Sequence, residues 1–194
     1  MDGANIDGVV ISNISMAGIE TPIFVRLGNR GRGLNPPVPG SAQNISISNI
    51  VVRGASMASS VTGIPGYPVR RVSLSNIAIT MEGGNHGPKG LDVPEHIAKY
   101  PEGNMFGVLP AYGFYGRHAE GLTLSNVSAR WDKEDLRPAM VFDDVKDLTV
   151  DGFRTDTVAG SSPVVWLNNA IDALIRGSRP ALEKGLLRVT GATQ

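Results

Sequence analysis

One short pattern of alternating apolar and polar residues, closed by Asn or Gly, returns along the chain. Its four clear and two weaker copies end, in order, at Asn13, Asn49, Asn76, Asn126, Gly152 and Gly177. The intervals are 36, 27, 50, 26 and 25 residues, so the period is about 25 with two longer steps. A repeat of this length is typical of a solenoid, whose coils bury their apolar faces against one another.

Each copy predicts a short strand followed by a corner. Strict alternation gives a strand one buried and one exposed face. Asn tolerates left-handed backbone angles nearly as Gly does, which explains why the two exchange at the corner. In stacked copies, the Asn side chains are also expected to hydrogen-bond in a ladder.

A second strand fits between successive copies. The segments that predict it are 22–27, 60–64, 112–117, 138–143, 163–168 and 185–189. We therefore expect an all-β fold, a right-handed, single-stranded parallel β-helix of about six coils, with residues 1–194 forming one domain. A leucine-rich repeat would need Leu-x-x-Leu-x-Leu spacing, which is missing, and a β-sandwich would not explain the constant phase.

Two insertions depart from the period, at about 29–42 and 82–109. The first is rich in Gly, Pro and Arg. The second is predicted to contain a short helical turn at 93–100. Insertions on a solenoid normally project from one face, often the binding face.

Composition narrows the function. Lys plus Arg and Asp plus Glu are both 18, so the net charge is zero, which disfavours a nucleic-acid partner. No apolar run approaches the roughly 18 residues that cross a bilayer, and we expect no membrane partner. The chain has no Cys, and its start lacks the basic and apolar regions of a signal peptide, which leaves the cellular location open.

Three segments, 21–28, 109–118 and 137–145, together with the repeated strands, resemble family 28 of the glycoside hydrolases. The resemblance implies the pectin-lyase-like solenoid and the later coils of a polygalacturonase, a family that is usually secreted or periplasmic. It also implies a partner, an acidic oligosaccharide or polysaccharide of the pectin type.

The family's catalytic motifs are missing, namely Asn-Thr-Asp, Asp-Asp in its family context, Gly-His-Gly and Arg-Ile-Lys. We therefore expect a C-terminal part that is inactive alone. The alternative is a non-catalytic β-helix module for carbohydrate binding, or for homo-oligomeric assembly through an exposed N-terminal coil. A pectate-lyase-like enzyme ranks last, because no calcium-binding cluster of carboxylates is visible.

Candidate substrate-binding residues fall into two groups. Arg26, Asn29 and Arg30 follow an early strand, where an arginine fork could pair with a uronate carboxylate; the alternative is a solvated loop. In the second group, Tyr115 with Tyr112 offers aromatic faces, and Arg117 and His118 offer donors. The alternative there is core packing with solvated polar neighbours.

No catalytic residue is predicted beyond Asp143, a weak candidate. Asp143 and Asp144 are adjacent on a strand and should point to opposite faces, so a turn-capping role is favoured. His86 and His96 lack metal-ligand spacing, and we expect no metal and no cofactor. Trp131 and Trp166 are expected in the core or at the end of the stack.

Overall fold

The computed structural model describes residues 3–85, 90–158, 163–183 and 185–193, which form strands and loops but no helix. The strands are β1 (Asn5–Ile19), β2 (Phe24–Arg26), β3 (Ser41–Ala55), β4 (Ser59–Thr62), β5 (Val69–Gly83), β6 (Phe114–Lys133), β7 (Met140–Asp151), β8 (Arg154–Thr155), β9 (Val165–Arg176) and β10 (Leu187–Thr190).

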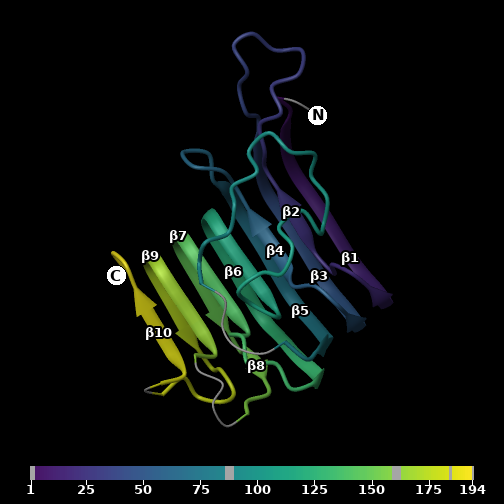
Figure 1. Ribbon diagram of the computed structural model, residues 1–194, viewed down its shortest axis with the longest axis vertical. Coiled ribbons are helices and arrows are strands. Elements are labelled where there is room, and N and C mark those ends of the chain that lie inside the picture. Colours follow the sequence, from purple (N-terminus) through teal and green to yellow (C-terminus); the bar gives the residue numbers. More distant parts are fainter. Residues whose placement is uncertain (1–2, 86–89, 159–162, 184, 194) are drawn as a thin grey trace.

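The named strands pair in parallel. The main ladder runs β1-β3-β5-β6-β7-β9-β10, so the strands lie side by side from β1 to β10 (Figure 1). The short strands form a second ladder, in which β2 pairs with β4 and β4 with β6. Parallel pairing requires each chain segment to return to the same end before the next strand begins. The predicted all-β fold with a large parallel sheet is confirmed, and the stacking is that of a parallel β-helix.

The repeated Asn residues form one column at a corner of the stack. The register aligns Asn13, Asn49, Asn76 and Asn126, and places Gly152 and Gly177 after them. All six have positive φ, between 51° and 72°. Nδ2 of each later Asn donates to Oδ1 of the one before, at 2.9, 3.1 and 2.9 Å. The predicted column and its amide ladder are confirmed.

A second column of positive φ was not predicted. It consists of Gly8, Asn44, Arg71, Gly121, Asp147 and Asp172. A single left-handed residue redirects a strand without ending the ladder, because the flanking residues resume pairing. For this reason the segments predicted as separate strands at 112–117 and 122–127 belong to one continuous strand, β6.

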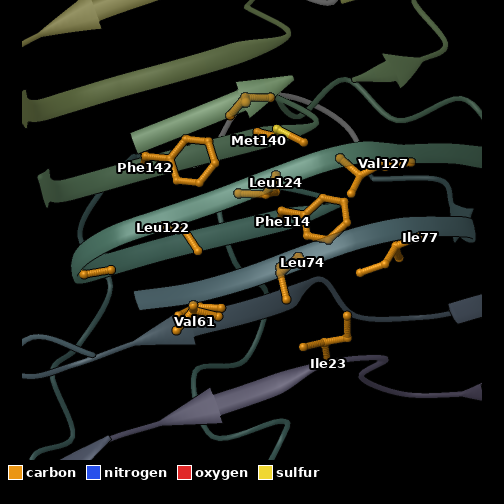
Figure 2. Close-up of a cluster of buried hydrophobic side chains, with 14 of the residues drawn as sticks. Ile23, Val61, Leu74, Ile77, Phe114, Leu122, Leu124, Val127, Met140 and Phe142 are labelled. Carbon is orange, nitrogen blue, oxygen red and sulfur yellow. The ribbon is translucent and has the colours of Figure 1, made fainter. Parts of the chain in front are cut away.

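The core lies between the long and the short strands. Leu74 of β5 and Leu122 of β6 gather with Val61 of β4 and Phe142 of β7 in one buried cluster (Figure 2). Each rung contributes a few side chains and relies on its neighbours to cover them. This shared burial agrees with a repeat whose single coils cannot exclude water alone.

One end of this core is open. Most side chains of β1 are exposed, including the inward-facing Ile6 at 43% and Ile11 at 40%. An apolar groove of about 560 Å³ extends there between β1 and β2 and is lined by residues such as Ile11, Ile14 and Ile23. In the middle of the stack, on β3, β5, β6 and β7, the corresponding inward positions are buried.

The two insertions are loops that join β2 to β3 and β5 to β6. The expected helical turn at 93–100 forms no helix. Instead, a single turn occurs in which the Lys99 amide donates to the His96 carbonyl at 3.1 Å. His96 has a φ of 47°, a left-handed backbone angle that a right-handed helical turn does not contain.

Replacement of Asn76 by Ala tests the corner column. The φ of Asn76 is 53°, and its side chain both donates and accepts in the ladder. We expect a loss of about 2 kcal/mol in the free energy of unfolding, measured in urea, from left-handed strain and lost hydrogen bonds. Asn76→Gly should cost about 1 kcal/mol less, since Gly accepts this φ. Equal stability of the two variants would contradict the assignment.

Candidate functional site

The outward face of the short strands is covered by the β5–β6 loop, whose described residues are 84–85 and 90–113 (Figure 1). A second apolar cluster lies between them. Val93 and Leu109 of the loop pack with Tyr115, Val141 and Trp166 of the stacked strands. The longer insertion therefore lies against the face that carries the predicted site residues.

Arg26, the last residue of β2, ties the loop to the stack. Its Nη1 donates to the Gly63 carbonyl at 2.5 Å, and its Nη2 donates to the Glu95 carbonyl at 2.6 Å. Desolvation lowers the pKa of Arg26 to about 10, aided by the positive charge of Arg117 and opposed by Glu95. Arg26 remains charged at neutral pH, and much of its hydrogen-bonding capacity is used within the protein.

Arg117 and His118 meet at a carboxylate from the loop. Glu95 Oε1 contacts Arg117 Nη2 and lies 3.0 Å from His118 Nε2. Arg117 Nη1 also donates to the Val93 carbonyl at 2.5 Å. The sequence pattern did not indicate Glu95, because a residue in an insertion has no strand phase that would place it.

A chain of polar contacts supports these residues from behind. Arg117 Nε lies 3.5 Å from Asp143 Oδ2, and Asn168 Nδ2 donates to Asp143 Oδ1 at 2.7 Å. Thr190 Oγ1 donates to Asn168 Oδ1 at 2.8 Å. These positions are stacked in register on β6, β7, β9 and β10, so the row of polar residues behind Arg117 extends over four strands.

Asp143 and Asp144 do not follow simple alternation. Asp144 has a φ of 54°, and its Oδ2 lies 2.5 Å from His118 Nδ1. The positive φ turns the strand, so the side chains of Asp143 and Asp144 point to the same edge. In the same way, Arg117 and His118 both point to Glu95. Asp143 is 8% exposed with both oxygens engaged, an environment unsuited to an acid or a base. It pairs with Asn168 and Arg117, and the favoured turn-capping role is not observed.

The far end of the loop is anchored by a buried ion pair. Arg137 Nη2 donates to Asp135 Oδ2 at 2.7 Å, and both residues are at most 4% exposed. Arg137 Nη1 also reaches the carbonyls of Leu109 and Ala111, at 3.1 and 3.2 Å. The loop is thus fixed to the stack on both sides of Glu95.

An open pocket of about 230 Å³ lies beside the loop, near the start of β3. Arg26, Arg30, Lys99 and Tyr100 line it, and none of its described lining residues is acidic. The Arg30 guanidinium lies 4.8 Å from the Tyr100 ring centroid, and Tyr100 is 61% exposed. We call this the cationic pocket.

The charges around the pocket affect His96. Its pKa is lowered, first by slight desolvation and then by the positive charges of Lys99 and Arg26. Its Nε2 lies 3.2 Å from Lys99 Nζ, a geometry in which the neutral ring accepts from the ammonium group. Cations therefore gather on this side of the loop.

The other predicted residues divide between the two regions. Asn29 lies beside the pocket, and its backbone N–H donates to the Ile97 carbonyl at 2.7 Å. Tyr115 is 2% exposed, and burial raises the pKa of its phenol. A ring so covered presents no face to a sugar in this conformation. Tyr112 is equally buried in the core, with its hydroxyl against Thr155, and Trp166 is 7% exposed.

No group of three or more His, Cys, Asp or Glu side chains suited to a metal occurs within the described ranges. His86 lies outside the described residues. Of the part of the chain that the structure describes, no helix has the length and apolar character to cross a membrane.

No protein-family model matches the chain, and no curated protein sequence matches it. A solved structure from Parabacteroides merdae, named a "putative glycosyl hydrolase", is similar at 11% identity with a TM-score of 0.46. The alignment covers 96% of this chain and 81% of that protein. Similarity at this level does not establish a shared family or function.

Replacement of Arg117 by Ala tests the cluster around Glu95. It would leave Glu95 and Asp143, whose side chains are 27% and 11% exposed, without their cation. We expect the free energy of unfolding in urea to fall by about 2 kcal/mol. This loss is smaller than the loss on breaking a fully buried pair, because the Glu95 side chain is partly exposed to solvent. Arg130→Ala, which breaks an exposed pair with Asp156, should cost under about 0.5 kcal/mol. Equal losses would show that the cluster contributes no special stability.

Proposed function

We propose that this chain binds an acidic, pectin-type oligosaccharide or polysaccharide in the cationic pocket and does not hydrolyse it alone. The observation that carries the proposal is the meeting of Arg26, Arg30 and Lys99 around one opening that no described acidic side chain lines. The opening would hold one sugar unit with its carboxylate.

The chemistry of the pocket suits a uronate. A guanidinium pairs with a carboxylate through two parallel hydrogen bonds, and an ammonium adds a mobile point charge. The exposed ring of Tyr100 offers an apolar face to the sugar ring. Because Arg26 is already bonded to two carbonyls, Arg30 and Lys99 are the residues that recognise the ligand.

The absence of hydrolysis follows from the carboxylates. Inverting glycosidases need an acid and a base about 6.5–9.5 Å apart on either side of the scissile bond. The cationic pocket has no described carboxylate on its lining, and Asp143 is engaged within the stack.

The same proposal includes the finer architecture. About six coils of a right-handed, single-stranded β-helix of the polygalacturonase type would place all outward short strands on one face. Crossovers between parallel strands are right-handed in nearly all proteins, which supports this hand. The ladder β2-β4-β6, with β7, β9 and β10 continuing it, supports one such face.

Replacement of Arg30 or Lys99 by Ala should weaken the binding of trigalacturonate about tenfold, since each removes one charge-assisted contact worth roughly 1.4 kcal/mol. Isothermal titration at low salt measures the affinity. Binding should fall further as salt is raised, because the pocket is open to solvent. No reducing sugar should appear during the titration.

Arg53→Ala is the matched control, because Arg53 is exposed on β3 and its loss changes the net charge equally. Unchanged affinity in Arg30→Ala and Lys99→Ala, or an equal loss in Arg53→Ala, would contradict the pocket assignment. Release of reducing sugar at ordinary enzymatic rates would contradict the absence of hydrolysis.

A second candidate function, self-assembly, is favoured by the open end of the core. The groove of about 560 Å³ and the exposed apolar side chains of β1 are unlike the rest of the stack. β1 has 15 residues and spans about 50 Å when extended. A second copy that packs against this face would bury the same apolar surface on both chains.

Ile11→Lys, at a residue that lines this groove and is 40% exposed, should shift a dimer of this 20.5-kDa chain to the monomer, observed by light scattering after size-exclusion chromatography. A charge in the centre of an apolar interface is strongly unfavourable. Leu174→Lys is the control, because Leu174 is 50% exposed on the distant strand β9. A wild-type protein that is monomeric at all accessible concentrations would exclude this candidate.

A further inference from the structure

Glu95 occupies a position that a carboxylate of a ligand could fill. Its Oε1 is held by Arg117 Nη2 and by His118 Nε2 at 3.0 Å. Arginine and histidine converging on one carboxylate oxygen form a charge-assisted anion site. The carboxylate belongs to the loop, whereas both donors belong to β6 of the stack.

The donors are oriented without help from Glu95. His118 is 8% exposed, and its Nδ1 lies 2.5 Å from Asp144 Oδ2. Arg117 Nε lies 3.5 Å from Asp143, which Asn168 holds in turn, and Arg117 Nη1 donates to the Val93 carbonyl rather than to Glu95. A binding site whose donors are fixed from behind requires little ordering when an anion arrives.

Unpaired polar atoms lie next to this site. Thr62 Oγ1 is buried and has no hydrogen-bond partner among the described residues, and the buried Tyr115 hydroxyl has none beyond its interaction with Arg117. Thr62 is in register with Arg117, and Tyr115 precedes Arg117 by two residues on the same face. Buried polar groups are normally satisfied, so such a group of unpaired atoms points to hydroxyls or water that the site can accept.

We propose that Arg117 and His118 form a carboxylate-binding site, that Glu95 is its internal occupant, and that the carboxylate of an acidic sugar displaces Glu95. The inference rests on the proposed function for its ligand class and extends it to a second subsite. Together with the cationic pocket, the site would bind a second charged unit of the same oligosaccharide. Tyr115 and Thr62 would then meet the hydroxyls of that unit.

Competition sets the expected size of the effect. A tethered group acts at an effective concentration of up to millimolar, and an external ligand binds only the fraction of molecules whose site is vacated. A site occupied by Glu95 for about 90% of the time or more would lower the ligand affinity about tenfold or more. Removal of the Glu95 carboxylate should therefore raise the ligand affinity by the same factor.

The test uses Glu95→Ala in the full chain with acetate as the simplest carboxylate probe. Acetate should shift the NMR signals of the His118 ring in a saturable manner, and acetamide, its neutral counterpart of similar shape, should not. Wild type should respond about tenfold more weakly to acetate. Glu120→Ala, which removes an exposed carboxylate paired with Arg70, should behave as wild type. If Glu95→Ala folds poorly, Glu95→Gln removes the charge with less loss of packing and should give the same direction.

Digalacturonate provides the second measurement, with about tenfold tighter binding expected in Glu95→Ala. Failure of acetate to reach His118, or an equal response to acetamide, would overturn the carboxylate site. A third outcome separates the two proposals. If digalacturonate binds in an Arg30-dependent manner but Glu95→Ala leaves its affinity unchanged, the second subsite is overturned and the proposed function remains intact. No binding of digalacturonate to either protein would overturn the proposed function, and the acetate result alone would then decide the site.

Discussion

Hydrogen bonding between parallel strands in fixed register determines where the remaining side chains lie. It stacks equivalent positions of successive coils, so a residue type that suits a corner once suits it in every coil. Asn13, Asn49, Asn76 and Asn126 show this directly, since the amide of each reaches the carbonyl oxygen of the one before. The same register places Arg117, Asp143, Asn168 and Thr190 in one row. The repeat of the backbone therefore aligns polar side chains of successive coils so that they contact one another.

Register also explains how adjacent residues come to act together. In a regular strand, Arg117 and His118 would face opposite sides of the sheet. The φ of His118 is 49°, and the turn that it produces directs both side chains to Glu95. Asp143 and Asp144 repeat this arrangement one coil later and hold the two donors from behind. The corner therefore serves both the fold and the contacts with the Glu95 carboxylate.

The long loop between β5 and β6 has two effects on this face. It adds an apolar layer, in which Val93 covers Tyr115 and its neighbours, and it supplies polar groups to the arginines below. At the same time, Lys99 and Tyr100 join Arg30 in an opening that remains accessible. The face is thus divided into a covered part, where Glu95 satisfies the donors, and an open part, where the donors lack an acidic neighbour among the described lining residues. Recognition of a chain of uronates would use the two parts in succession.

The sequence alone determined the elements of the repeat. Local alternation specifies a strand and its buried face, and the Asn and Gly positions specify a backbone angle that few residues accept, so the parallel strands and the Asn column could be predicted. Arg26, Arg30, Arg117 and His118 could be named from their side-chain chemistry and from their place on or just after predicted strands. Only the tertiary structure decided that Tyr115 is covered, that Asp143 is engaged, and that Glu95, Lys99 and Tyr100 lie beside the predicted residues. Those outcomes depend on the path of a loop without periodicity, and that path is fixed by contacts with Arg26, Arg117 and Arg137 that are distant in sequence.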